Sequence, residues 1–431
     1  MKKTSLLLLT ALVSVAMVCV STMALAGTVG NYPGKWYGWW CPYEDGGPPL
    51  AGVIPEVENQ EVIKSWGHET GNSFEEIKDL IPDFFYNEVL LQPEIWGAFR
   101  INETAYIPTG AKPWLEATEK YKGVASLDEK GHIQNYKAGC PFPGTTNAKE
   151  IGWNIVKRRA NGDNIDYPFV WQIVDKKGHS RWIAALNYYM FFDGRLALDP
   201  RPNYEPNPRN IEFIQSACYN APYDLRGTVA LAIRYDSAKK QDDMWMYLPS
   251  LRRVRRMSTA QRWDRLPGGG DLFWDNLEMF WGKPTNYEWK YMGRKTILCA
   301  HNAKAEAQSV KNKIMGGVDN YFSRVNTVVV EVVPMEHMRA PVSRFVLYLD
   351  PIEYLPLWGV YYDKKGKPWI GNLFEASWDA NWIRMPYNML EFDLQRKHFT
   401  GTYLRDFGAN VEKLVPEFFE MDNLKKVAGG R

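Results

Sequence analysis

Short segments with alternating or continuous hydrophobic patterns recur between residues 167 and 378, and they constrain the fold of this chain most strongly. Turn sequences such as Asp175-Lys176-Lys177-Gly178 separate neighbouring segments, as in β-hairpins. The strands predicted in this way are residues 169–174, 181–192, 211–219, 227–235, 244–248, 325–333, 344–349, 354–362 and 369–378. We therefore predict a mainly β (α+β) fold built on one large, strongly curved antiparallel sheet.

A capping residue followed three positions later by an acidic residue predicts each of three short helices. They are expected near residues 73–91, 147–161 and 275–281, against the concave side of the sheet. Residues 93–145 are expected to be irregular, and the C-terminal run 411–427 to be a helix or an irregular tail.

The N-terminus has the three parts of a secretory signal peptide: two lysines, an apolar run from Leu6 to Val20, and small residues ending at Ala26. Cleavage after Ala26 is favoured over acylation of Cys19, because Val18 is too bulky for a lipoprotein signal. We expect a periplasmic protein, with association to the outer membrane left open. The predicted organisation is a signal peptide (residues 1–26), an irregular and short-helical arm (27–145) and a β body with a C-terminal tail (146–431).

The charge balance argues against a nucleic-acid partner. The chain has 52 basic and 50 acidic residues, and two of the lysines lie in the predicted signal peptide, which leaves 50 of each sign. A protein that binds nucleic acid through a whole domain needs an excess of basic residues on it. The cluster of arginines at 252–256 is therefore a local feature.

No pattern of catalytic or metal-binding residues is present in the sequence. The histidines are scattered, and neither a nucleophile elbow nor a phosphate-binding loop occurs. We predict neither enzyme activity, nor a metal, nor a cofactor. The cysteines outside the predicted signal peptide allow two alternatives, free buried thiols or two disulfides, Cys41 with Cys140 and Cys218 with Cys299.

The stretch from Met244 to Gly293 contains the candidate ligand-binding residues. Two aromatic strands, residues 244–248 and 287–292, flank a basic loop and a short helix. If the basic run is extended, Arg252 and Arg256 face one side and Arg253 and Arg255 the other. The candidates are Arg252, Arg253, Arg255, Arg256, Trp263, Trp274, Phe280, Trp281, Tyr287 and Trp289.

Two explanations of the arginines remain open. In the first they pair with Asp264, Asp271 and Asp275 and stack on Trp263 or Trp274. In the second, one pair lies at the mouth of a groove and binds a lipid phosphate or carboxylate through bidentate hydrogen bonds.

The same stretch resembles domain-of-unknown-function family thirteen-twenty-nine, whose members are often named outer-membrane lipoprotein-sorting proteins. The resemblance rests on Tyr247-Leu248-Pro249, the arginine run 252–256, Met279-Phe280, Gly282, Pro284 and Tyr287-Glu288-Trp289-Lys290, and it extends over roughly residues 60–400. It implies an unclosed half-barrel with a helical lid, like that of periplasmic lipoprotein carriers. It also implies partners, namely a resistance-nodulation-division-type exporter and an outer-membrane β-barrel.

These observations favour a non-catalytic periplasmic carrier or adaptor for a lipid or another hydrophobic molecule. Burial of a fourteen-carbon chain at ~0.8 kcal/mol per methylene would contribute about 10 kcal/mol before association costs. The alternatives are a structural subunit of an exporter–outer-membrane assembly, and a sugar-binding protein or hydrolase that uses aromatic platforms. A continuous hydrophobic cavity would favour the carrier over the structural subunit.

Overall fold

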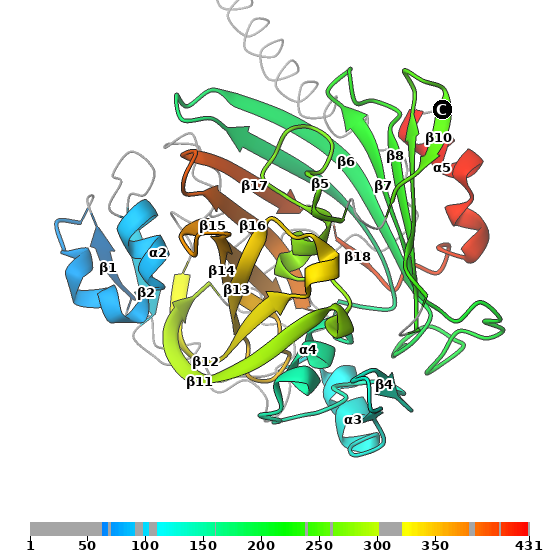
Figure 1. Cartoon of the computed structure of the whole chain (residues 1–431), viewed down its shortest axis with the longest axis horizontal. Helices are drawn as coiled ribbons and strands as arrows, with labels where there is room; N and C mark the ends of the chain where they lie inside the picture. The colour runs from blue at the N-terminus through cyan, green and yellow to red at the C-terminus, as the bar shows by residue number, and fades with distance from the viewer. Residues whose placement is uncertain are drawn as a thin grey trace, which may run out of the picture.

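A computed structural model describes residues 63–67, 70–90, 98–102, 110–159, 161–237, 240–258, 262–300, 321–378, 384–404 and 407–429. Within these ranges, one sheet of 16 strands runs in the order β1-β2-β12-β13-β14-β15-β16-β17-β5-β6-β7-β8-β9-β10, with β11 paired to β12 and β18 paired to β5. Figure 1 shows that this sheet is strongly curved and does not close. The prediction of a curved, unclosed, mainly β fold is confirmed. The sheet is mixed rather than purely antiparallel, because β2 and β12 pair in parallel.

The first half of the large sheet is formed by β5 (Asn164–Val174), β6 (Ser180–Phe191), β7 (Ile211–Ala221), β8 (Val229–Tyr235), β9 (Asp243–Leu248) and β10 (Arg253–Arg256). The strands β1 (Ile63–Gly67) and β2 (Ala98–Asn102) lie at the opposite end of the sheet, beside β12. The second half is formed by β11 (Tyr287–Cys299), β12 (Tyr321–Pro334), β13 (Val342–Leu349), β14 (Pro356–Asp363), β15 (Pro368–Trp378), β16 (Arg384–Asp393), β17 (His398–Leu404) and β18 (Gly408–Ala409). A separate two-stranded sheet is formed by β3 (Ser126–Leu127) and β4 (Ile133–Gln134).

The described helices are short. They are η2 (Phe74–Leu80), α2 (Asp83–Phe85), η3 (Tyr86–Leu90), α3 (Lys112–Lys120), α4 (Ala148–Val156), η5 (Trp274–Met279), η6 (Pro284–Asn286), η7 (Glu336–Met338), η8 (Pro416–Phe419) and α5 (Met421–Gly429). None of them has both the length and the apolar composition that crossing a bilayer requires.

The predicted helix starts are confirmed at two positions. Ser73 accepts a hydrogen bond from the Glu75 amide, and Asn147 accepts one from the Lys149 amide, so both side chains satisfy backbone donors at a helix start. The extent of the second helix was wrong, because α4 ends at Val156. The prediction that residues 93–145 are irregular missed α3, which begins without a side-chain cap.

The short helix predicted over residues 275–281 is present only in part. The segment forms the 3-10 helix η5, which ends at Met279 and breaks at Leu277 (φ −52°, ψ 135°) and Glu278 (φ 50°, ψ 30°). Met279 also has a positive φ, of 64°. Such conformations persist only where the surrounding structure enforces them, and here the Tyr361 hydroxyl donates to the Met279 carbonyl.

Two hydrophobic clusters lie on opposite faces of β6–β8, because successive side chains of a strand alternate between faces. On β6, Leu186, Tyr188 and Met190 belong to the outer cluster, which the C-terminal segment with α5 covers. Ala185 and Tyr189 belong to the inner cluster. We call residues 262–281 the inner segment, because most of its apolar side chains pack into the inner cluster, between the two halves of the sheet.

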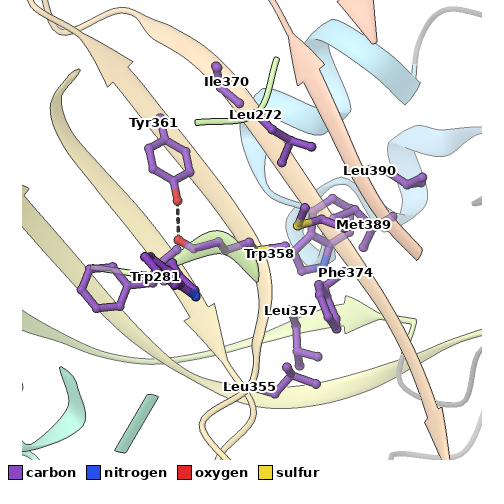
Figure 2. Close-up of a cluster of buried hydrophobic side chains, with 14 of the residues drawn as sticks. Leu272, Trp281, Leu355, Leu357, Trp358, Tyr361, Ile370, Phe374, Met389 and Leu390 are labelled. Carbon is purple, nitrogen blue, oxygen red and sulfur yellow. Dashed lines mark hydrogen bonds between the residues drawn. The ribbon is translucent and has the colours of Figure 1, made fainter. Parts of the chain in front are cut away.

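The inner cluster extends through the second half of the sheet. Figure 2 shows part of it, including Trp358, Phe374 and Met389 from neighbouring strands. Phe84 and Phe85 of α2 pack on Trp358, and Ile151 of α4 belongs to the same cluster, so the first two predicted helices pack into this core. The position of α5 on the outer face was not predicted.

Cys140 and Cys218 are buried free thiols, and Cys299 is buried as well. A disulfide between Cys218 and Cys299 is therefore absent, and the alternative of free thiols holds for Cys140 and Cys218. The predicted signal peptide and Cys41 lie outside the described residues. The division between an arm and a body at residue 145 stays a prediction, although β2 of the arm pairs with β12 of the body.

Candidate functional site

An apolar cavity lies between the inner segment and the inner face of the sheet. Its empty space is about 640 Å³ when the part open to solvent is included, and about 70 Å³ of it is open to the centre of a water molecule. The smaller volume has room for a few water molecules, since each takes ~30 Å³ in the liquid. The enclosed part of the cavity therefore fits a few methylene groups, and a longer molecule would extend through the opening.

One wall of the cavity follows directly from strand geometry. The inward-facing side chains of β5, β6 and β7 recur at every second position. They are Tyr167, Phe169 and Trp171, then Asn187 and Tyr189, then Gln215, Ala217 and Tyr219.

The rest of the lining comes from parts of the chain that are distant in sequence, including β17, which pairs with β5. The inner segment contributes Leu266, Leu272, Trp274, Leu277 and Glu278, and the strands β15–β17 contribute Phe374, Met389, Thr402 and Leu404. Apolar and aromatic lining with a few polar groups is typical of small-molecule sites in proteins.

Three polar atoms of the lining residues are buried within the cavity wall and have no hydrogen-bond partner among the described residues. They are Gln215 Oε1, Thr402 Oγ1 and Trp274 Nε1, and the three side chains are buried. A buried polar group without a partner costs ~1–3 kcal/mol of stability, which water or a ligand in the cavity would offset.

Glu278 is the charged residue of the lining. The kink in η5 places it at the cavity, and its side chain keeps 35% of its surface accessible. Arg158 Nη2 lies 3.8 Å from Glu278 Oε2. Burial raises the pKa of Glu278 above its ordinary value, and the charge of Arg158 opposes part of this rise.

Buried ion pairs fix the inner segment to β8 and β9. Arg262 donates to Asp275 Oδ1 at 2.6 Å and to Asp242 Oδ2 at 2.7 Å, and Arg234 also pairs with Asp242 at 3.2 Å. Both guanidinium groups lie over the ring of Trp281. Burial alone would raise the pKa of Asp242, but its cationic neighbours hold it at about 2. These contacts determine where the cavity wall lies.

A second polar cluster lies where the inner segment meets β16 and β17. Asp271 accepts hydrogen bonds from Thr400 Oγ1 at 2.9 Å and from Arg265 at 2.7 Å, and it lies 2.5 Å from Nδ1 of His398. Asn276 Nδ2 donates to Glu391 Oε1 at 2.5 Å. Among the described residues, no group of three or more His, Cys, Asp or Glu side chains could hold a metal ion.

The Glu391 carboxyl predicts a pH dependence of stability. Burial, together with the charge of Asp271, raises the pKa of Glu391 from 4.5 to about 8. The folded chain therefore binds this proton more tightly than the unfolded chain, and the contribution to stability is lost as pH rises from about 4.5 to about 8. The free energy of unfolding of the native chain should fall between about pH 5 and about pH 8. We expect the fall in Glu391→Gln to be smaller by at least ~1 kcal/mol.

Urea unfolding across this pH range measures the effect. Glu336→Gln is the control, because Glu336 is exposed, and we expect this variant to unfold with the profile of the native chain. Parallel profiles for the native chain and Glu391→Gln would show that Glu391 is ionised in the fold.

The ten candidate residues predicted from the sequence lie in three different places: one at the cavity, five in the core and four at the edge of the sheet. Trp274 lines the cavity. Trp281 packs on Phe213 and on the arginines of the buried ion pairs, while Phe280, Tyr287 and Trp289 pack against one another in the core of the second half of the sheet. Trp263 is buried against Phe273. None of these five lines the cavity.

The arginine run lies at the edge of the sheet instead of at the cavity. Arg252 is in the turn between β9 and β10 with φ 49°, and the residues of β10 are exposed. Arg256 pairs with Asp243. The expected partners were wrong, because Asp271 and Asp275 pair with Arg265 and Arg262. The alternative of a groove-mouth site lacks support, since none of the four arginines lines the cavity.

The cavity residues on β5–β7 and Glu278 were missed as site residues. The alternation in residues 167–171 and 215–219 carried a usable signal, because each run places large or polar side chains on one face. Nothing in the sequence placed Glu278 beside them, since its position depends on the kink in η5.

A model of the family described as "Protein of unknown function (DUF1329)" matches residues 99–425 of the chain. An uncharacterized protein of Pseudomonas aeruginosa is 28% identical over 211 residues, which are 48% of this chain and 44% of that protein. The chain thus spans less than half the length of this curated relative.

Three solved structures are similar at low identity. A DUF1329 family protein from Desulfovibrio piger has 18% identity and a TM-score of 0.48 over 65% of this chain and 100% of that one. An outer membrane lipoprotein-sorting protein domain from Vibrio parahaemolyticus has 16% identity and a TM-score of 0.47, with coverage of 65% and 100%. A LolA superfamily protein from Nitrosomonas europaea has 12% identity and a TM-score of 0.41, with coverage of 64% and 98%.

Proposed function

The chain belongs to the DUF1329 family, and we propose that it is a non-catalytic carrier that binds the apolar part of a hydrophobic molecule in the cavity. The observation that carries this proposal is the aromatic lining of an open cavity in which three buried polar atoms lack partners. A purely structural subunit has no need of such a space, because an apolar interior is normally filled with side chains.

The enclosed volume of the cavity is too small for the whole acyl chain that was expected from the sequence. About three buried methylene groups would contribute ~2 kcal/mol before association costs, so the remainder of a longer ligand must bind at the opening. This agrees with a carrier that picks up and releases its ligand rather than retaining it.

The proposal places the protein in the periplasm, on the basis of the signal peptide expected over residues 1–26. A resistance-nodulation-division-type exporter and an outer-membrane β-barrel are the proposed partners, on the basis of the family resemblance alone. Association with the outer membrane belongs to the same proposal.

Filling the cavity tests the carrier function. Ala217 lies on β7 and lines the cavity, so Ala217→Phe places a ring in the space that the ligand would occupy. We expect the affinity for the neutral fluorescent probe N-phenylnaphthylamine to fall by at least about ten-fold, equivalent to ~1.4 kcal/mol. Fluorescence titration of the purified chain measures this.

Val124→Phe is the matched control, because Val124 is 42% exposed and does not line the cavity. It should bind the probe like the native chain. Equal binding by Ala217→Phe and the native chain, with thermal unfolding unchanged, would locate the probe elsewhere and contradict the proposal.

A further inference from the structure

We propose that the cavity selects molecules whose headgroup donates hydrogen bonds and is neutral or cationic, and that Glu278 recognises this headgroup. The inference rests on the proposed function and specifies the class of ligand. It excludes the free fatty acids and lipid phosphates that the arginine run at 252–256 had suggested.

The charge of the lining supports this selectivity. The side chains that line the cavity include one carboxylate, Glu278, and no lysine, arginine or histidine. The nearest cation, Arg158, is already engaged, because its Nη1 donates to Asn161 Oδ1 at 2.6 Å and its Nη2 faces Glu278 at 3.8 Å. An anionic headgroup at the cavity would therefore meet a carboxylate without a free guanidinium to bind it.

The unpartnered polar atoms point to the same chemistry. Gln215 is 6% exposed, and its amide nitrogen makes a long hydrogen bond of 3.5 Å to Asn187 Oδ1. This orientation leaves Gln215 Oε1 as an acceptor at the cavity without a partner among the described residues. Asn187 in turn donates from Nδ2 to the Tyr167 hydroxyl at 2.6 Å. Thr402 Oγ1 also lacks a partner there.

The lining thus presents one strong acceptor, the Glu278 carboxylate, and holds a second, the Gln215 carbonyl, buried within its wall. Hydroxyl, amide and ammonium groups satisfy both acceptors, whereas a carboxylate or a phosphate satisfies neither. Charge repulsion between two carboxylates a few ångströms apart is large enough inside a protein to change affinity by at least about ten-fold.

A series of amphiphiles with one chain length and different headgroups tests the inference. Dodecanol, dodecylamine and laurate are titrated below their critical micelle concentrations against the delipidated full chain carrying N-phenylnaphthylamine. We expect dodecanol and dodecylamine to displace the probe with affinities at least about ten-fold higher than laurate.

Glu278→Gln removes the charge and retains the shape of the side chain. In this variant we expect the preference for dodecylamine over laurate to fall by at least about ten-fold, while dodecanol changes by less than about three-fold. Glu288→Gln, at an exposed position of β11, should keep the preference of the native chain.

The outcomes separate the two proposals. Tight binding of laurate to the native chain, or an unchanged preference in Glu278→Gln, would overturn the headgroup selectivity and leave the carrier function intact. If none of the three molecules displaces the probe, the cavity binds no amphiphile and both proposals fail. The comparison of dodecanol, dodecylamine and laurate on the native chain tests the headgroup selectivity even if Glu278→Gln does not fold.

Discussion

Replacement of Arg262 by methionine is expected to lower the free energy of unfolding by about 3–5 kcal/mol. Arg262 is 4% exposed and pairs with both Asp242 and Asp275. Its removal leaves two buried carboxylates with fewer cationic partners, and among the described residues Asp275 then keeps the Tyr287 hydroxyl as its side-chain donor. Urea unfolding at neutral pH measures the loss.

The arginines at the sheet edge provide the control for this substitution. Arg255→Met changes an exposed side chain of β10 and should alter stability by less than ~0.5 kcal/mol. A loss below ~1 kcal/mol in Arg262→Met would mean that the inner segment is positioned by its apolar contacts and not by the buried ion pairs.

Replacement of Trp358 by alanine is expected to cost about 3–5 kcal/mol of unfolding free energy. Trp358 is fully buried, its ring lies 4.6 Å from that of Phe85, and its Nε1 donates to the Leu298 carbonyl at 2.8 Å. Trp358 lies among the buried side chains of Figure 2, so the substitution leaves a large cavity, and it also leaves the Leu298 carbonyl without its donor.

Trp182→Ala is the matched control, because Trp182 on β6 is 44% exposed. We expect it to unfold within ~1 kcal/mol of the native chain. If the two tryptophan variants were equally stable, α2 would not be packed on β14 through Trp358.

The sheet could be predicted from the sequence because strand signals are local. Alternation in residues 287–291 and the turn at 175–178 are readable without knowing what lies beside them. β16 and β17 were missed, and Pro386 within β16 weakens a strand pattern. The strands there are specified by their neighbours, since β17 pairs with β5 from the other end of the body.

The cavity could not be predicted, because sequence signals are local and the cavity is formed by segments that are distant in sequence. Its walls combine β5–β7, the inner segment and β15–β17, which only the long-range pairing of the sheet brings together. The basic run was the most visible feature of the sequence, yet it forms an exposed hairpin. The less visible Arg262 and Arg265 are the ones that pair with buried aspartates. Burial of a charge depends on tertiary structure and leaves no periodic signal.

The central claim is that the cavity holds a hydrophobic molecule. Native mass spectrometry of the chain purified from the periplasm, followed by solvent extraction, tests it most directly. We predict a species heavier than the polypeptide by the mass of one amphiphile, which solvent extraction removes and which is lost in Ala217→Phe. Detection of the bare polypeptide mass alone, with no amphiphile in the extract, would contradict the claim.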